Sequence, residues 1–119
     1  MEYMLLIYSS EADFKRRSDE ENQAISREYL QFTKDTQASG HYQRGDRLQS
    51  VETATSVRIR EGKVLKTDGP FAETREQLAG YYLLSAKDHD EACALAARLP
   101  GARFGTIEVR PIVKMPGFP

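Results

Sequence analysis

The chain has 119 residues, with 17 basic and 18 acidic side chains and a formal net charge of −1. This length predicts a single domain spanning residues 1–119, and the near-neutral balance argues against direct nucleic-acid binding. The longest apolar run, Tyr3–Tyr8, is far shorter than the ~20 residues of a membrane-spanning helix, and the single cysteine, Cys93, fits a reducing compartment, so we expect a cytoplasmic protein without a membrane span.

The first expected elements are a strand at Tyr3–Tyr8, a polar stretch at Ser9–Arg17 and a long helix. The apolar residues of the strand are consecutive, so we expect both of its faces to be covered, one by helices and the other by a second copy or a curled sheet. Ser18 and Glu21 have the spacing of a capping box and Gly40 supplies a left-handed stop, which predicts a helix running to about Ser39. Its buried stripe comprises Ile25, Tyr29, Phe32 and Thr36.

The sequence pattern of residues 41–67 predicts extended structure. The polar stretch His41–Ser50 contains one glycine and is consistent with a short strand and a turn. Thr55–Arg60 alternates, Glu61–Gly62 forms a turn, and Lys63–Thr67 returns, which together predict a two-stranded hairpin.

A turn, a helical turn and another strand are expected next. Asp68–Phe71 reads Asp-Gly-Pro-Phe, a typical turn sequence, and Glu73–Leu78 is interpreted as a helical turn. Gly80–Ala86 is rich in residues that favour strands.

A second helix and a final strand complete the chain. Asp88 and Glu91 again have the capping-box spacing, and Pro100-Gly101 is expected to stop this helix. The last strand is predicted from Gly105 to about Val113. The buried stripe of the helix comprises Ala92, Leu95, Ala96 and Leu99.

Without the hairpin, the order is strand, helix, strand, strand, helix, strand. This order is that of an α+β, ferredoxin-like βαββαβ fold, here with an inserted β-hairpin. Such a sheet carries both helices on one face and leaves the other open. The apolar first strand therefore predicts that two subunits press their open faces together, as a homodimer with the architecture of a dimeric α+β barrel.

The segment Thr67–Tyr82 closely resembles the signature of the DGPF branch of the YCII-related domain family. Further matching pieces are Gly45–Gln49, Thr55–Arg58 and Ile107–Pro111, so the resemblance covers nearly the whole chain. It implies a ferredoxin-like dimer, in agreement with the pattern of elements.

The resemblance also implies candidate chemistry. The broader family is proposed to be enzymatic, with a His on the first helix and an Asp near the second strand, and some relatives resemble dehalogenases or lactone-processing enzymes. Here Tyr29 stands where that His is expected, and Asp46 is the candidate for the acidic partner. The resemblance to the DGPF branch also implies an association with alternative sigma factors, as their neighbours or fusion partners. This association implies a regulatory function as the alternative.

The Asp68 turn is the first candidate site. Asp68 either caps the turn through its own side chain or faces a pocket as a catalytic carboxylate, aimed by the fixed φ of Pro70. Gly69, Pro70 and Phe71 of the same turn are candidate ligand-binding residues, as is Glu73. Glu73 adds a second carboxylate nearby, and paired carboxylates can divide acid and base roles. We expect a rigid turn beside a pocket that also contains Arg110 or Tyr29.

The remaining candidates come from other elements. Tyr29 either packs in the core or donates its hydroxyl to a ligand. Glu108 and Arg110 share one face of the last strand, where they either form an exposed ion pair or line a cavity, with Arg110 as an anchor for a carboxylate. His41 lies in a loop and is a candidate general base. Two His and one Cys form no recognisable metal cluster, and we expect no cofactor.

These observations leave three functions open. The first is a small-molecule-binding homodimer that acts as an enzyme, performing proton-transfer chemistry of the isomerase, lyase or dehalogenase kind on a small anionic compound. The second is a non-catalytic ligand-binding or regulatory module associated with an alternative sigma factor. The third is an interaction domain whose Asp68 turn shapes the dimer.

Overall fold

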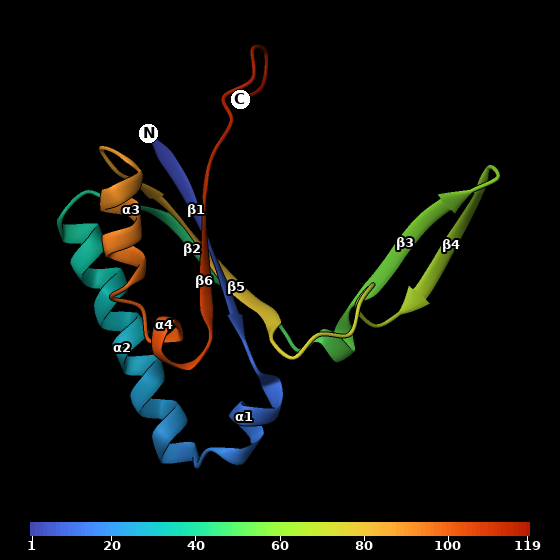
Figure 1. The fold of residues 1–119 in the computed structure, drawn as a ribbon, viewed down its shortest axis with the longest axis horizontal. Helices are drawn as coiled ribbons and strands as arrows, with labels where there is room; N and C mark the ends of the chain where they lie inside the picture. Colours follow the sequence, from blue (N-terminus) through green and yellow to red (C-terminus); the bar gives the residue numbers. More distant parts are fainter.

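The computed structural model describes residues 1–119 and combines a four-stranded antiparallel sheet, helices on one of its faces, and a separate two-stranded hairpin (Figure 1). The elements in chain order are β1 (Glu2–Ser9), α1 (Glu11–Arg16), α2 (Asp19–Ala38), β2 (Tyr42–Arg47), the 3₁₀ turn η1 (Val51–Thr53), β3 (Thr55–Arg60), β4 (Lys63–Asp68), β5 (Gln77–Ser85), α3 (His89–Ala96), α4 (Gly101–Phe104) and β6 (Thr106–Pro111).

The sheet has the strand order β2-β5-β1-β6, and every neighbouring pair is antiparallel. With the β3–β4 hairpin set aside, this is the order of a ferredoxin-like α+β fold, so the predicted fold class is confirmed. Both long helices lie on the same side of the sheet, and the other side has no covering element (Figure 1). We call this uncovered side the open face.

The core lies between the sheet and the helices. Tyr3, Leu5 and Ile7 of β1 are buried, whereas Met4 and Leu6 between them are only half-buried on the open face. Within one chain, therefore, a single face of β1 is fully covered. The stripe predicted for the second helix is buried in full, although its last member, Leu99, lies beyond the end of α3. Phe32 and Thr36 are the buried residues of α2, and together with Tyr82, Leu84 and Ala86 these positions form the core.

The long helix begins and ends as predicted. The Ser18 hydroxyl accepts from the Glu21 N–H at 3.1 Å and the Glu21 carboxylate accepts from the Ser18 N–H at 3.2 Å, which completes the capping box. Gly40 follows the last turn with a φ of +80°, in the left-handed region that glycine adopts without strain.

The predicted hairpin forms, and it projects away from the rest of the molecule (Figure 1). Glu61 and Gly62 join its strands, both with positive φ, as a tight hairpin turn requires. We call residues 55–68 the arm. Because of the arm the molecule measures 49 × 47 × 19 Å, and it is broad and thin.

Three local predictions were wrong. The polar stretch before α2 contains the short helix α1, whose N-cap hydroxyl on Ser10 accepts from the Asp13 N–H at 3.1 Å. Glu73–Leu78 forms bends and then the start of β5 rather than a helical turn, because pairing with β1 holds this segment extended. Pro100 does not end the second helix: α3 ends at Ala96, and Pro100 is the N-cap of α4.

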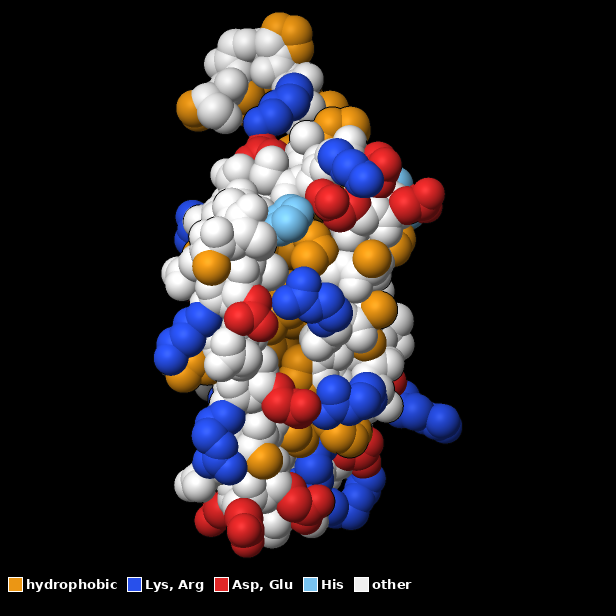
Figure 2. Space-filling model, turned by 90° about the vertical axis from the view of Figure 1, so that its left-hand side faces the viewer, with side chains coloured by type: hydrophobic (Ala, Val, Ile, Leu, Met, Phe, Trp, Pro, Cys, Tyr) orange, Lys and Arg blue, Asp and Glu red, His pale blue; other side chains and the backbone are white.

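The helical side of the molecule carries mixed charge. Figure 2 shows basic and acidic side chains interspersed over it, with hydrophobic side chains visible in the groove between them. No helix is both long enough and apolar enough to cross a lipid bilayer.

Candidate functional site

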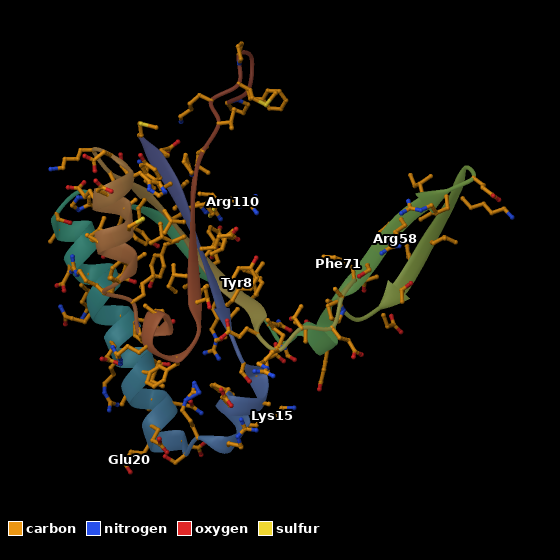
Figure 3. The ribbon with its side chains drawn as sticks, in the orientation of Figure 1. Tyr8, Lys15, Glu20, Arg58, Phe71 and Arg110 are labelled. Carbon is orange, nitrogen blue, oxygen red and sulfur yellow. The ribbon has the colours of Figure 1, made fainter.

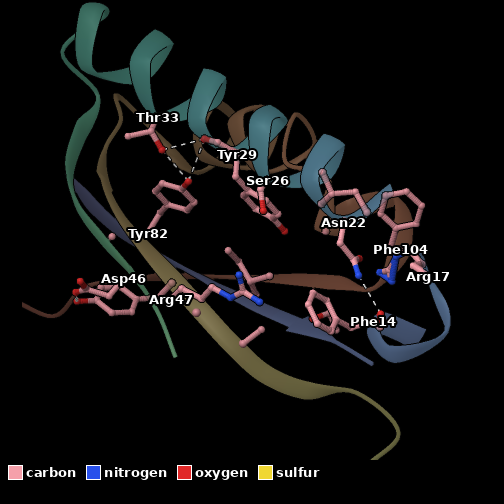
Figure 4. A pocket seen from close by; sticks show the side chains of 18 of the residues that line it. Phe14, Arg17, Asn22, Ser26, Tyr29, Thr33, Asp46, Arg47, Tyr82 and Phe104 are labelled. Carbon is pink, nitrogen blue, oxygen red and sulfur yellow. Dashed lines mark hydrogen bonds between the residues drawn. The ribbon is translucent and has the colours of Figure 1, made fainter. Parts of the chain in front are cut away.

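A cavity of about 400 Å³ lies between α2 and the helix-covered face of the sheet (Figure 4). It forms because α2 is buried only through Phe32 and Thr36, in its second half, while Ile25 and Tyr29 nearer its start are half-buried. α1, α4 and the edge strand β2 close the sides. A volume of this size is typical of sites for small organic molecules.

The walls of the cavity are largely apolar. Ile7 forms part of the sheet floor, Ile25 comes from α2, and Phe14 and Phe104 come from α1 and α4. Two hydrogen bonds hold α1 in place: the Asn22 amide donates to the Phe14 carbonyl at 3.0 Å, and the N–H of Glu11 donates to the side chain of Gln77 at 2.9 Å. The two phenyl rings are each about half exposed, so they stand at the mouth.

Arg47, the last residue of β2, extends into this cavity (Figure 4). Its register partner is Gly80, which pairs in turn with buried Ile7, so all three lie on the core face of the sheet. Since Gly80 has no side chain, space remains in front of β5 for the arginine stem. The Arg47 guanidinium lies 5.5 Å from the ring centroid of Phe14, and it forms no ion pair.

Arg17 provides a second cation, from the link between α1 and α2. Its guanidinium lies 5.2 Å from the ring centroid of Phe104, and it also has no ion pair. The Arg17 Nε is the only buried side-chain nitrogen or oxygen atom in the protein without a hydrogen-bond partner. A buried donor left unpaired destabilises the unliganded fold, which makes this atom the strongest indication of a missing acceptor.

Hydroxyl groups line the inner end of the cavity. The hydroxyls of Thr33 and Tyr82 lie 2.9 Å apart, and Thr33 also donates to the carbonyl of Tyr29 at 3.0 Å (Figure 4). Burial raises the pKa of Tyr29 and the pKa of Tyr82 above their ordinary values, so both phenols are protonated at neutral pH. Tyr29 therefore offers a hydrogen-bond donor and not a base.

The one carboxylate among the lining residues, Asp46, faces the other side of the sheet. Asp46 pairs in register with Tyr81, whose hydroxyl donates to it at 2.6 Å, and Arg44 donates to the same oxygen at 3.0 Å. The Tyr81 hydrogen bond, followed by that from Arg44, lowers the pKa of Asp46 below its usual value. Asp46 and Tyr29, the positions implied by the family resemblance, thus lie on opposite faces, and their side chains do not form a pair.

Of the predicted site residues, Tyr29 and Asp46 line this cavity, and only Tyr29 is on its core side. Asp68 ends β4 and is exposed; Gly69, with a φ of +93°, donates its N–H to the Ala54 carbonyl at 2.8 Å at the base of the arm. Pro70 is exposed, and Phe71 is 81% exposed beside the arm (Figure 3).

The other predicted residues lie elsewhere. Glu73 is exposed, in the segment that leads into β5. Arg110 and Glu108 form an ion pair of 3.1 Å on the open face, away from the arm (Figure 3). His41 follows α2, with its Nε2 3.2 Å from Glu91 and its Nδ1 2.7 Å from the Ser39 hydroxyl. The structure therefore does not bring these residues together, and their proposed roles stay predictions.

Sequence reasoning missed the two cavity arginines. One available signal was the spacing of Ser10 and Asp13, typical of a helix start, which would have placed Phe14 and Arg17 at the end of a short helix. Another was the alternation along β2, which puts Arg47 on the same face as Gly45. No local pattern in the sequence shows that the end of α1 and the core face of β2 border the same cavity.

Two comparisons identify related proteins. The sequence model described as "YCII-related domain" matches residues 1–116. A protein of Rhizobium meliloti (strain 1021), named "Uncharacterized protein R00369", is 34% identical over 114 residues, which cover 94% of this chain and 92% of the relative.

Proposed function

The chain belongs to the YCII-related domain family, and from that premise we propose that it binds a small organic anion in the cavity between α2 and the sheet. Family membership names no ligand. The ligand class therefore comes from the residues that line the cavity and from their charges.

The observation that carries the proposal is the pair of arginines without counter-ions. The Nε of Arg17 is buried without an acceptor, and Arg47 enters the same cavity with no carboxylate partner. The side chain of Arg17 is half-buried and that of Arg47 is exposed, and a bound anion supplies both with charge and acceptor atoms. The planar guanidinium matches the two oxygens of a carboxylate bidentately, so a carboxylate suits this pair of arginines.

The apolar walls define the rest of the ligand. Phe14 and Phe104 flank the mouth and Ile25 lies between them and the hydroxyl-lined end, so a ring or short hydrocarbon body fits the cavity. Tyr29, protonated at neutral pH, can donate to a ligand oxygen.

Binding is proposed in preference to proton-transfer catalysis. A general base for work near neutral pH is most often a His or a carboxylate. The lining residues include no His, Glu or Cys, and the carboxylate of Asp46 is turned to the open face with a lowered pKa. The groups that face the ligand are guanidinium, hydroxyl and amide groups, which hold an anion but do not remove a proton at neutral pH.

The test is calorimetric titration of the protein with benzoate, succinate and malate, with benzamide as the neutral analogue of benzoate. We expect at least one carboxylate to bind and benzamide not to bind. Arg47→Met should weaken that carboxylate by at least about tenfold, which corresponds to ~1.4 kcal/mol.

Arg110→Met is the matched control, because Arg110 is equally an arginine of an edge strand but lies on the open face in an ion pair with Glu108. We expect the affinity of this variant to equal that of the wild type. Loss of binding in Arg110→Met with full affinity in Arg47→Met would refute the cavity and favour the open face as the anion site.

A further inference from the structure

Arg17 and Arg47 border the cavity from different sides. Arg47 ends β2, whereas Arg17 follows α1, and Figure 4 shows the two guanidiniums apart, with Phe14 between them. The Arg47 guanidinium lies 5.5 Å from the ring centroid of Phe14, and that of Arg17 lies against a different ring, 5.2 Å from the centroid of Phe104. A carboxylate bound to one of these arginines therefore leaves the other without an acceptor.

The cavity presents two positive charges and no facing negative charge. Its charged lining residues are Arg17, Arg47 and Asp46, and the Asp46 carboxylate is bound to Tyr81 on the open-face side. A monoanion compensates the charge of one guanidinium only, whereas a dianion compensates both. Since a guanidinium binds a carboxylate through two parallel hydrogen bonds, two arginines at separate places match two carboxylates.

Two acidic residues beside Arg17, Asp13 and Glu21, are bound to other groups. Both lie with Arg17 around a small outer hollow, and neither lines the cavity. The Asp13 carboxylate pairs with Arg16, and the Glu21 carboxylate accepts from the N–H and the hydroxyl of Ser18. The hydrogen bonds from Ser18, and less strongly the charge of Arg17, lower the pKa of Glu21. Glu21 is therefore a capping group without an ion pair to Arg17, and the Arg17 Nε still lacks an acceptor.

The space between the two arginines has walls without charge. The rings of Tyr29 and Phe14 lie on opposite sides of this space (Figure 4). Tyr29 is protonated at neutral pH because burial raises its pKa, and the Asn22 amide is already bonded to the Phe14 carbonyl at 3.0 Å. The part of a ligand that spans this space therefore meets aromatic surface, which favours a ring or a hydrocarbon chain.

We propose that the ligand of the cavity is a dicarboxylate whose two carboxylates are held apart by a short apolar body, with one carboxylate on Arg47 and the other on Arg17. This inference rests on the proposed function, which requires one carboxylate only. It adds the second carboxylate and the separation between the two. A ligand of this kind gives both guanidiniums acceptors at once and places its body between Tyr29 and Phe14.

The first experiment is calorimetric titration of the wild-type protein with terephthalate, the monoamide of terephthalate, and phthalate. The monoamide keeps the size and shape of terephthalate but has one carboxylate, whereas phthalate keeps both carboxylates but places them on adjacent ring carbons. Adipate and its monoamide repeat the comparison with a flexible body. We expect the dicarboxylate of at least one pair to bind at least about tenfold more tightly than its monoamide, which corresponds to ~1.4 kcal/mol, and at least about tenfold more tightly than phthalate.

The second experiment repeats the titrations with Arg17→Met and Arg47→Met. With one arginine removed, the second carboxylate has no partner, so each variant should lower the affinity ratio of dicarboxylate to monoamide to near unity. Arg103→Met is the matched control, because Arg103 also stacks on the Phe104 ring, at 5.1 Å, but is paired with Glu28 at 2.7 Å. It removes the same charge beside the mouth of the cavity and should keep the wild-type ratio.

The possible results separate this inference from the proposed function. Monoamides that bind as tightly as both dicarboxylates would overturn the inference and leave the proposed function standing. Phthalate binding as tightly as the preferred dicarboxylate would overturn the separate placement of the two carboxylates, and so would a ratio that Arg17→Met or Arg47→Met leaves unchanged. Absence of binding by every carboxylate would refute the proposed function, and the inference with it. The comparison of ligands on the wild type does not depend on the folding of a variant.

Discussion

Arg17→Met is expected to make the unliganded protein more stable, although it removes a half-buried arginine. The buried Arg17 Nε has no acceptor, and leaving such a donor unpaired costs about 1–3 kcal/mol. Methionine keeps an unbranched apolar stem in the same place. What is lost is the contact of the guanidinium with Phe104 at 5.2 Å, which contributes ~0.5–1 kcal/mol. The net gain in the free energy of unfolding is therefore roughly 1 kcal/mol, which corresponds to about 4 °C in Tm for a chain of this size.

The assay is urea unfolding followed by far-UV circular dichroism, together with a thermal melt, in a buffer free of carboxylates and phosphate. Arg103→Met provides the control. Arg103 stacks on the same Phe104 ring at 5.1 Å, but its guanidinium is already satisfied by the Glu28 carboxylate at 2.7 Å. Removing the Arg103 guanidinium should lower the free energy of unfolding by up to about 1 kcal/mol, a change opposite in sign to that expected for Arg17→Met.

Equal destabilisation by the two variants would refute the reasoning, because it would show that the Arg17 Nε is not an orphaned donor. If the prediction holds, the chain keeps an arginine that weakens its own fold, a trade typical of binding sites. The same variant should then lose the stabilisation that a bound carboxylate gives the wild type, since that stabilisation follows from binding to the folded state alone.

Three further predictions concern the scaffold around the cavity. Ser18→Ala removes the capping box of α2 and should lower the free energy of unfolding by ~1 kcal/mol in urea melts. Gly80→Ala places a Cβ 2.7 Å from the Asp46 carbonyl oxygen in the neighbouring strand, so it should destabilise the protein by about 1–3 kcal/mol and disturb carboxylate binding in calorimetry. The hydrogen bond from the Lys87 N–H lowers the pKa of Glu91 below its usual 4.5, so the stability contributed by this carboxylate is present above that pH and is lost as the pH falls through the lowered value. Glu91→Gln should therefore destabilise the protein at about pH 6, and the difference from the wild type in urea melts should shrink as the pH is lowered below 4.5; a pH-independent difference would contradict the assignment.

Elements with short-range signals could be predicted from the sequence. The capping box at Ser18 and the stop at Gly40 delimit α2 because both act through bonds within a few residues. The arm follows from alternation and from the two turn residues at its tip. The order of these elements was enough to predict the ferredoxin-like topology, since few arrangements of strands and helices satisfy the rules on the handedness and length of chain connections.

Errors arose where tertiary contacts override local preference. Glu73–Leu78 has acidic residues typical of a helix start, but pairing with β1 holds its end extended. Pro100 is a typical helix stop, yet it begins α4, because proline is tolerated at the first turn of a helix as readily as beyond the last.

The sequence by itself determined the fold class of this protein and the presence of an apolar first strand. Only the tertiary structure decided where the cavity lies and which residues line it. Arg17 and Arg47 are far apart in the chain, and they line one cavity because α1 folds back beside α2 while β2 pairs with β5 at a glycine. Whether an arginine is a surface ion pair, like Arg110, or an unpaired anchor depends on which carboxylates reach it in three dimensions, and residue spacing along the chain does not contain that information.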